Sequence, residues 1–177
     1  MDAEPIKSLV KVLIPLAVIA LVAIVVKRRR LSAADAIGLK WPRMSHAAMW
    51  MVVYAALILG SDAVLHWRGP WDFEPWRQQA VLVSVFRVLA IGVLGPIAEE
   101  LLFRGLAQYL IGRTRLRIPG SIIIPAAVWA GIHLEYSVDV ITLLLVAGLL
   151  LGMARYQTAS LLTPIAMHIM WNLYAVW

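Results

Sequence analysis

Two adjacent carboxylates and an arginine interrupt a stretch of sequence that is otherwise apolar enough to lie in a bilayer. Glu99 and Glu100 stand in the middle of residues 93–105, and Arg104 follows one helical turn later. An ionisable side chain inside a membrane is costly, so it usually faces a protein interior or a wet cavity and serves a function. These three groups therefore mark residues 93–105 as a candidate site.

The spacing of the three groups predicts different roles for the two carboxylates. Glu100 and Arg104 are related as i and i+4 with the acid first, the order that favours an ion pair on a helix. Such pairing offsets much of the cost of burying both charges, so we expect these two residues to support the site. Glu99 points about 100° away around the helix and is left free to face His133. That placement suits a general base acting on water.

Two further segments carry polar groups where a lipid-facing helix would not need them. His133 comes four residues after Trp129, and His168 and Asn172 share one helical face. At about 1.5 Å per residue, Glu99, His133 and His168 each lie roughly 20–24 Å from the nearest basic end of their span, so they can share one layer. In that layer His133 could orient the water, while His168 and Asn172 could donate to the oxyanion of a tetrahedral intermediate.

The composition predicts a membrane protein. Hydrophobic residues make up 62% of the 177 positions and the mean hydropathy is +0.83, against roughly 45–50% apolar residues in soluble domains. We expect an all-α, polytopic transmembrane helical bundle of about six spans, the third of them interrupted at Gly95-Pro96. The candidate spans are residues 9–26, 45–65, 81–110, 119–135, 138–154 and 159–177.

The chain is predicted to be a single membrane domain with two parts. Residues 1–80 hold the first transmembrane helices and a Trp-rich loop, 66–80, that we expect to lie at the membrane interface. Residues 81–177 hold all of the candidate catalytic groups. The net charge of +6 comes largely from basic residues in three loops at span ends, near residues 27–43, 113–117 and 155. The positive-inside tendency makes these loops cytoplasmic, and it favours contacts with the lipid bilayer over nucleic acid.

The three motifs together resemble those of a known family. The pair Glu99-Glu100 with Arg104, the aromatic-x-x-x-His element ending at His133, and His168-x-x-x-Asn172 look like the signature of the CPBP family, the CAAX protease and bacteriocin-processing (Abi) enzymes with an Rce1-like catalytic core. The resemblance covers about residues 81–177. It implies a glutamic-type intramembrane protease, a peptide hydrolase without a cofactor.

The resemblance also implies a role for each matching residue. Glu99 and His133 would activate water, and His168 and Asn172 would form the oxyanion hole. The remaining two residues of the first motif would support the site. Trp129 stands where the family usually has Phe, so it would keep an aromatic wall and alter the substrate pocket.

The substrate implied is a membrane-anchored protein or peptide. CAAX-processing relatives have eight spans, and the smaller size here puts prenylated substrates in doubt. Compact bacterial members include proteases that process the C-terminal sorting anchors of exported proteins, which is the analogous role for this chain in a bacterial or archaeal cell membrane. Transfer of the cleaved product to another acceptor, rather than hydrolysis, is an open alternative, and the oligomeric state is not specified.

Other classes of function remain as alternatives. Two histidines and a glutamate could bind zinc, although the chain has no His-Glu-x-x-His motif. A transporter or partner-binding scaffold with a polar proton path would also explain buried Glu and His residues in general terms. A serine protease is disfavoured because Ser121 lies at a span start, far from His133. The absence of cysteine excludes a thiol nucleophile.

Overall fold

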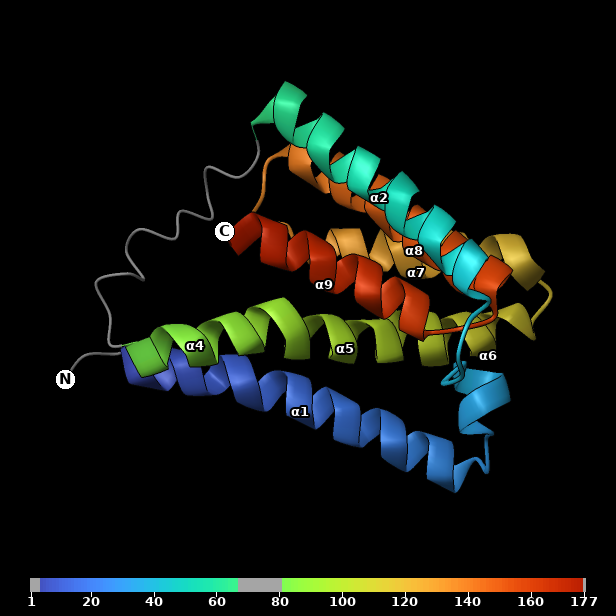
Figure 1. Cartoon of the computed structure of the whole chain (residues 1–177). Helices are drawn as coiled ribbons and strands as arrows, with labels where there is room; N and C mark the ends of the chain where they lie inside the picture. Colours follow the sequence, from blue (N-terminus) through green and yellow to red (C-terminus); the bar gives the residue numbers. More distant parts are fainter. Residues whose placement is uncertain (1–3, 67–80, 177) are drawn as a thin grey trace.

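The chain folds into helices joined by turns (Figure 1). The structure is a computed structural model that describes residues 4–66 and 81–176. Within these ranges no strand forms, which confirms the predicted all-α class. The Trp-rich loop predicted at 66–80 lies outside the described residues apart from residue 66.

The helices follow one another along the chain with two long unbroken segments in the first part. They are α1 (Glu4–Arg28), η1 (Ala33–Ile37), α2 (Met44–Leu65), α4 (Val81–Leu89), η3 (Ala90–Leu94), α5 (Gly95–Glu100), η4 (Leu101–Ala107), α6 (Gln108–Gly112), α7 (Arg117–Gly131), α8 (Val138–Thr158) and α9 (Leu162–Val176). The elements named η are π-helical turns.

Four of the described helical segments are long and apolar enough to cross a membrane, namely 9–28, 44–65, 81–112 and 138–158. The predicted spans at 119–135 and 159–177 correspond to α7 and α9, which have 15 residues each. A helix of that length rises about 22 Å, less than a hydrocarbon core of about 30 Å. The count of six spans therefore stays a prediction.

The third span is not interrupted at Gly95-Pro96, which corrects the sequence prediction. Residues 81–112 form one continuous helical rod in which π-turns replace the expected break. Pro96 lies in the first turn of α5, directly after η3. Proline has no backbone N–H to donate, and here the missing donor falls at the π-turn, so the helical rod continues. The two π-turns flank the Glu99-Glu100 pair, and π-turns inside α-helices are frequent at functional sites.

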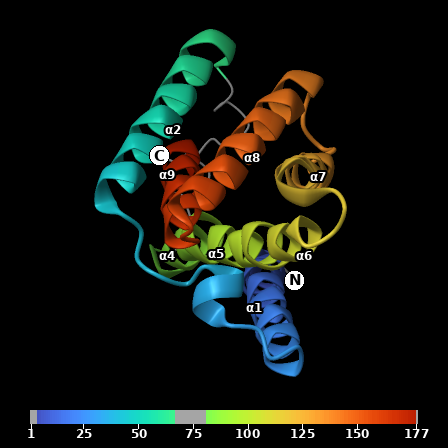
Figure 2. The ribbon, with the colours of Figure 1, turned by 90° about the vertical axis from the view of Figure 1, so that its right-hand side faces the viewer.

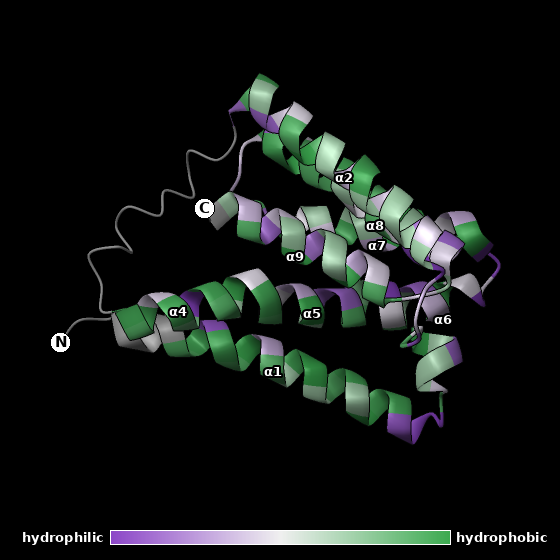
Figure 3. Ribbon diagram, viewed as in Figure 1, coloured by the Kyte–Doolittle hydropathy of each residue, from purple (hydrophilic) through white to green (hydrophobic). Residues whose placement is uncertain are grey.

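The surface of the bundle is strongly apolar along the helices. In Figure 3 hydrophobic colour covers most of α1 and α2, while hydrophilic colour appears in the middle of the bundle at α5 and the turn after it. Leu13 and Ile14 of α1 are more than half exposed. Exposed apolar area on this scale fits contact with lipid, so the chain is an integral membrane protein.

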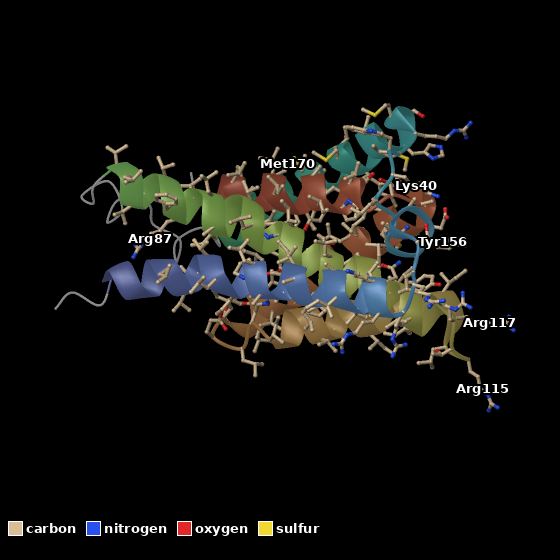
Figure 4. All side chains as sticks on the ribbon, turned by 90° about the horizontal axis from the view of Figure 1, so that it is seen from below. Lys40, Arg87, Arg115, Arg117, Tyr156 and Met170 are labelled. Carbon is tan, nitrogen blue, oxygen red and sulfur yellow. The ribbon has the colours of Figure 1, made fainter. Side chains whose placement is uncertain are left out.

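The basic loops gather at one end of the bundle. Figure 4 shows Lys40, Arg115 and Arg117 at the same end, and Arg87 at the other. The helices between these ends carry few charges. The charge asymmetry on which the sidedness prediction depends is therefore present in three dimensions.

The short helix α9 is the centre of the bundle. Figures 1 and 2 place it between α2 and α8 on one side and α5 on the other, and these elements are all in contact with it. The main core is built from apolar residues of α2, η4, α7, α8 and α9: Trp50, Tyr54, Ile58, Phe103, Trp129, Leu143, Ala147, Leu151, Ala154, Met167, Trp171 and Ala175. Contacts with three neighbouring helices hold α9 in place, and α9 carries His168 and Asn172.

A glycine seam on α8 sets how closely the neighbouring helices approach. A Cβ atom at Gly148 would lie 3.1 Å from the Ala126 Cβ, and one at Gly152 would lie 3.0 Å from the Ile122 side chain of α7. Small residues at this spacing let helix backbones pack closely. They also leave the glycine carbonyls open to side chains from the third span.

The segment between α1 and α2 is tied to the start of α9. The Ser160 hydroxyl donates to the Lys40 carbonyl at 2.6 Å, and the Leu161 N–H donates to the Gly38 carbonyl at 2.7 Å. Gly38 has φ +85°, and its Cα faces the Arg155 guanidinium so closely that a Cβ would lie 2.5 Å from it. These bonds anchor the first turn of α9 at the basic end.

Candidate active site

All three motifs contribute residues to one cavity of about 340 Å³, although Glu100 and Arg104 do not line it. Glu99 enters it from α5, His133 from the turn after α7, and His168 and Asn172 from α9. The other lining residues come from α1, η3, α5, α7, α8, α9 and the turn before α8: Lys11, Ile14, Pro15, Ala90, Ile91, Gly95, Trp129, Tyr136, Val140, Leu143, Leu144, Trp171 and Ala175. The predicted common layer is thus a walled, mostly apolar cavity with a few polar groups, the usual form of a ligand site.

Glu100 and Arg104 form the predicted i, i+4 ion pair. The Arg104 Nη1 donates to Glu100 Oε1 at 2.8 Å, and both side chains are buried. The same oxygen lies 2.9 Å from His168 Nδ1. An ionised carboxylate can only accept, so Nδ1 carries a proton and donates it to Glu100. Glu100 thereby connects the Arg104 charge to the orientation of the His168 ring.

Glu99 faces Trp129 and His168 rather than His133. Its Oε2 accepts a hydrogen bond of 2.5 Å from Trp129 Nε1 and lies 3.9 Å from His168 Nε2. The Glu99 side chain is 33% exposed, whereas that of Glu100 is fully buried. No hydrogen bond joins Glu99 to His133 among the described residues, although both side chains line the cavity. Of the two carboxylates, Glu99 is the one that water can reach.

His133 lies just beyond the end of α7, which corrects its predicted place inside a span. The helix ends at Gly131, a residue with poor helix propensity. The His133 Nδ1 stays 2.8 Å from the Trp129 carbonyl oxygen, so this nitrogen donates. In the neutral ring Nε2 then carries no proton, so it can accept a hydrogen bond from water.

Asn172 is held by a backbone carbonyl that the π-turn leaves free. The Gly95 N–H bonds to the Ala90 carbonyl, and Pro96 has no N–H to offer. The Ile91 carbonyl therefore lacks both of its helical donors, and it accepts from Asn172 Nδ2 at 2.9 Å. A side-chain amide has two N–H donors, so one remains for a ligand in the cavity.

Tyr136 adds an aromatic wall in the turn between α7 and α8. Its ring stacks on His133, with centroids 6.0 Å apart and planes 15° apart. Burial, followed by the negative charges of Glu135 and Glu99, raises the pKa of Tyr136 to about 12. The phenol therefore remains neutral at the mouth of the site across the physiological range.

Several contributors to the site were not found from the sequence. Arg104 Nη2 donates to the Gly148 carbonyl at 3.2 Å, and Gln108 Nε2 donates to the Gly152 carbonyl at 3.0 Å. The two donors, Arg104 and Gln108, are four residues apart, and so are the two acceptors, Gly148 and Gly152. This matching spacing is a signal that the sequence contains. The lining residues of α1 left no comparable signal, because their spacing does not match that of the three motifs, although Lys11 is a charged residue in an otherwise apolar part of that helix.

Among the residues that the structure describes, no three His, Asp or Glu side chains are grouped as ligands of a metal ion. Glu100 is already engaged by a guanidinium and an imidazole, and Glu99 by an indole N–H. The polar groups of the cavity thus bind one another in a pattern that differs from the zinc shells of proteins, in which His and carboxylate ligands surround the ion.

Comparison with protein families matches residues 80–174, more than half of the chain, to the family described as type II CAAX prenyl endopeptidase Rce1-like. The matched segment contains the Glu99-Glu100 pair, His133, His168 and Asn172. No curated protein and no solved structure matches the sequence. The chain therefore belongs to the Rce1-like family of membrane endopeptidases, and it is a peptide hydrolase.

Proposed function

We propose that this protein is a glutamic-type intramembrane protease that hydrolyses a peptide bond of a membrane-anchored protein or peptide without a metal. The observation that carries the proposal is the convergence of Glu99, His133, His168 and Asn172 on one cavity in an apolar bundle. Polar side chains are costly inside a membrane span and usually serve a function there, so their convergence on one cavity from separate segments supports a chemical role.

In the proposed reaction Glu99 is the general base. It is the accessible carboxylate of the pair, and the Trp129 N–H holds one of its oxygens in place. Glu99 removes a proton from a water molecule as the water oxygen bonds to the scissile carbonyl carbon. The resulting glutamic acid then returns the proton to the amide nitrogen as the C–N bond breaks, so protons balance over the cycle.

His133 would orient the attacking water. Its Nδ1 is committed to the Trp129 carbonyl, which leaves Nε2 as an acceptor for a water proton. A water held by both Glu99 and His133 would have its oxygen lone pair directed at the substrate.

The oxyanion would be stabilised from α9. His168 presents Nε2 to the cavity while Glu100 holds Nδ1, and Asn172 keeps one N–H after bonding to Ile91. With Nε2 protonated, these groups are two donors on one helical face. Preorganised donors of this kind usually provide a large share of the rate enhancement, because they are fixed before charge develops.

The substrate reaches the site from within the membrane in this proposal. The α1 residues that line the cavity, Lys11 to Pro15, lie about 20–25 Å by helix rise from the basic end at Arg28. If the basic loops are cytoplasmic, the cavity is nearer the opposite face, which suits a C-terminal sorting anchor of an exported protein in a bacterial or archaeal membrane. The prenylated CAAX tail named in the family description is the competing substrate.

The test is cleavage by purified protein of two reporters, one with a C-terminal transmembrane anchor and one with a farnesylated C-terminal peptide. Wild type is compared with Glu99→Gln, each with and without a strong metal chelator. Glu135→Gln is the matched control, because Glu135 is an exposed carboxylate near the site that does not line the cavity. We expect cleavage to survive chelation and to fall at least about 100-fold in Glu99→Gln alone.

Each outcome separates the alternatives. Loss of cleavage on chelation, with recovery on adding zinc, would favour a metalloprotease. Full activity of Glu99→Gln would refute the assignment of the base. Absence of cleavage of either reporter would favour a scaffold or transporter, and recovery of the released fragment joined to an amine acceptor would indicate transfer rather than hydrolysis.

A further inference from the structure

Two fully buried polar atoms beside the site have no hydrogen-bond partner among the described residues. They are the Tyr54 hydroxyl and Glu100 Oε2. Arg104 and His168 both bind the other oxygen, Oε1, although a carboxylate can accept bonds at both oxygens. Buried polar groups are almost always paired, directly or through an internal water, so each of these atoms requires a partner.

Tyr54 belongs to α2, which packs on α9, the helix that carries His168 and Asn172. Its ring lies against Trp171, with centroids 5.4 Å apart and planes inclined by 55°. Trp171 is one helical turn after His168 on α9. The charges of Glu100 and Arg104 act on the Tyr54 hydroxyl. The Tyr54 ring therefore packs beside the part of α9 that binds the Glu100 carboxylate.

Few other groups could satisfy the two atoms. The remaining unpartnered buried side-chain atoms of the described residues are Trp50 Nε1, Gln108 Oε1, Arg155 Nε and Thr163 Oγ1. Only the Gln108 oxygen in this set resembles Glu100 Oε2 in being purely an acceptor. Glu100 is bound by His168 of α9, and the Tyr54 ring packs on Trp171 one turn further along that helix, so the donor and the acceptor that lack partners are best matched to each other.

We propose that Tyr54 is a positioning residue of the active site, whose hydroxyl is linked to Glu100 Oε2 across one buried water. This link would fix the second oxygen of the carboxylate that holds His168. The proposal rests on the proposed function for its effect on catalysis. It extends the site to α2, which precedes the segment matched to the family.

A change at Tyr54 should act on the rate rather than on substrate binding. Tyr54 does not line the cavity, so its loss removes no substrate contact. Without the hydroxyl, the Glu100 carboxylate loses a fixed donor and holds the His168 ring less firmly. The effect should therefore appear in kcat and leave KM nearly unchanged.

The first experiment compares Tyr54→Phe with Tyr174→Phe. Tyr174 is the matched control, because it lies at the same α2–α9 contact and its hydroxyl donates to Asp62 at 2.7 Å. We expect kcat to fall about 5- to 30-fold in Tyr54→Phe, with KM within about twofold of the wild-type value. Tyr174→Phe should leave both kcat and KM unchanged. Equal kcat values for the two variants would overturn the proposal.

The second experiment needs no activity. Thermal unfolding in detergent is measured for wild type, Tyr54→Phe, Glu100→Gln and the double variant. We expect the shifts in Tm to be non-additive by at least about 2 °C, because the proposed buried water links the two side chains. Additive shifts would refute the link. If neither reporter is cleaved by wild type, the proposed function fails, while this cycle still decides whether Tyr54 is linked to Glu100.

Discussion

Replacing Arg104 by methionine should destabilise the protein far more than the loss of a surface arginine would. The Arg104 guanidinium is 1% exposed, donates to Glu100 and to the Gly148 carbonyl, and lies 4.9 Å from the centre of the Trp129 ring. Methionine keeps the length and apolar bulk of the side chain. It leaves the Glu100 carboxylate buried without its counter-charge, which typically costs about 3–5 kcal/mol.

That cost is large against a total stability of roughly 5–15 kcal/mol. For a chain of this size it corresponds to a fall of roughly 10 °C in Tm. If the stranded charge is the cause, removing it should restore stability. The double variant Arg104→Met with Glu100→Gln should therefore recover about half of the loss, while remaining inactive because His168 has lost its carboxylate.

The assay is thermal unfolding of purified protein in detergent, followed by tryptophan fluorescence, together with cleavage of the anchored reporter. Arg113→Met is the control, because Arg113 is exposed, and its side chain donates to the Tyr109 hydroxyl at 3.3 Å. An Arg104→Met protein that melts within about 1 °C of wild type would refute the reasoning. So would a double variant no more stable than Arg104→Met, since the stranded carboxylate would then not be the cause.

Three further predictions follow from local geometry. Trp129→Phe keeps the aromatic wall but removes the N–H that binds Glu99, so activity should persist with kcat reduced about tenfold or less, as the cleavage rate of the anchored reporter would show. Gly38→Ala should lower Tm by several degrees, because Gly38 has φ +85° and the new Cβ would meet the Arg155 guanidinium; an unchanged melting curve would contradict this. The Tyr136 pKa of about 12 means that its phenol absorbance should not change at pH 10, and stability should fall between pH 10 and 12 as the unfolded chain ionises there first; a spectroscopic titration of wild type against Tyr136→Phe tests both.

Local patterns in the sequence were sufficient to predict several features of the structure. The Glu100–Arg104 pair could be predicted because four residues of helix fix the distance between two side chains, even where π-turns replace part of the α-helix. The long spans could be predicted because about 20 apolar residues have few other environments. The joint presence of the two Glu residues, His133, His168 and Asn172 also indicated the family that the comparison with known families then showed.

Only the tertiary structure decided which groups contact one another. Trp129, within α7, donates to Glu99, whereas His133, beyond the last residue of that helix, binds the Trp129 carbonyl. Asn172 meets the Ile91 carbonyl because a π-turn and Pro96 remove that carbonyl's helical donors. Contacts of this kind depend on how helices end, bulge and pack across tens of residues, whereas spans and i, i+4 pairs depend on neighbours along one helix.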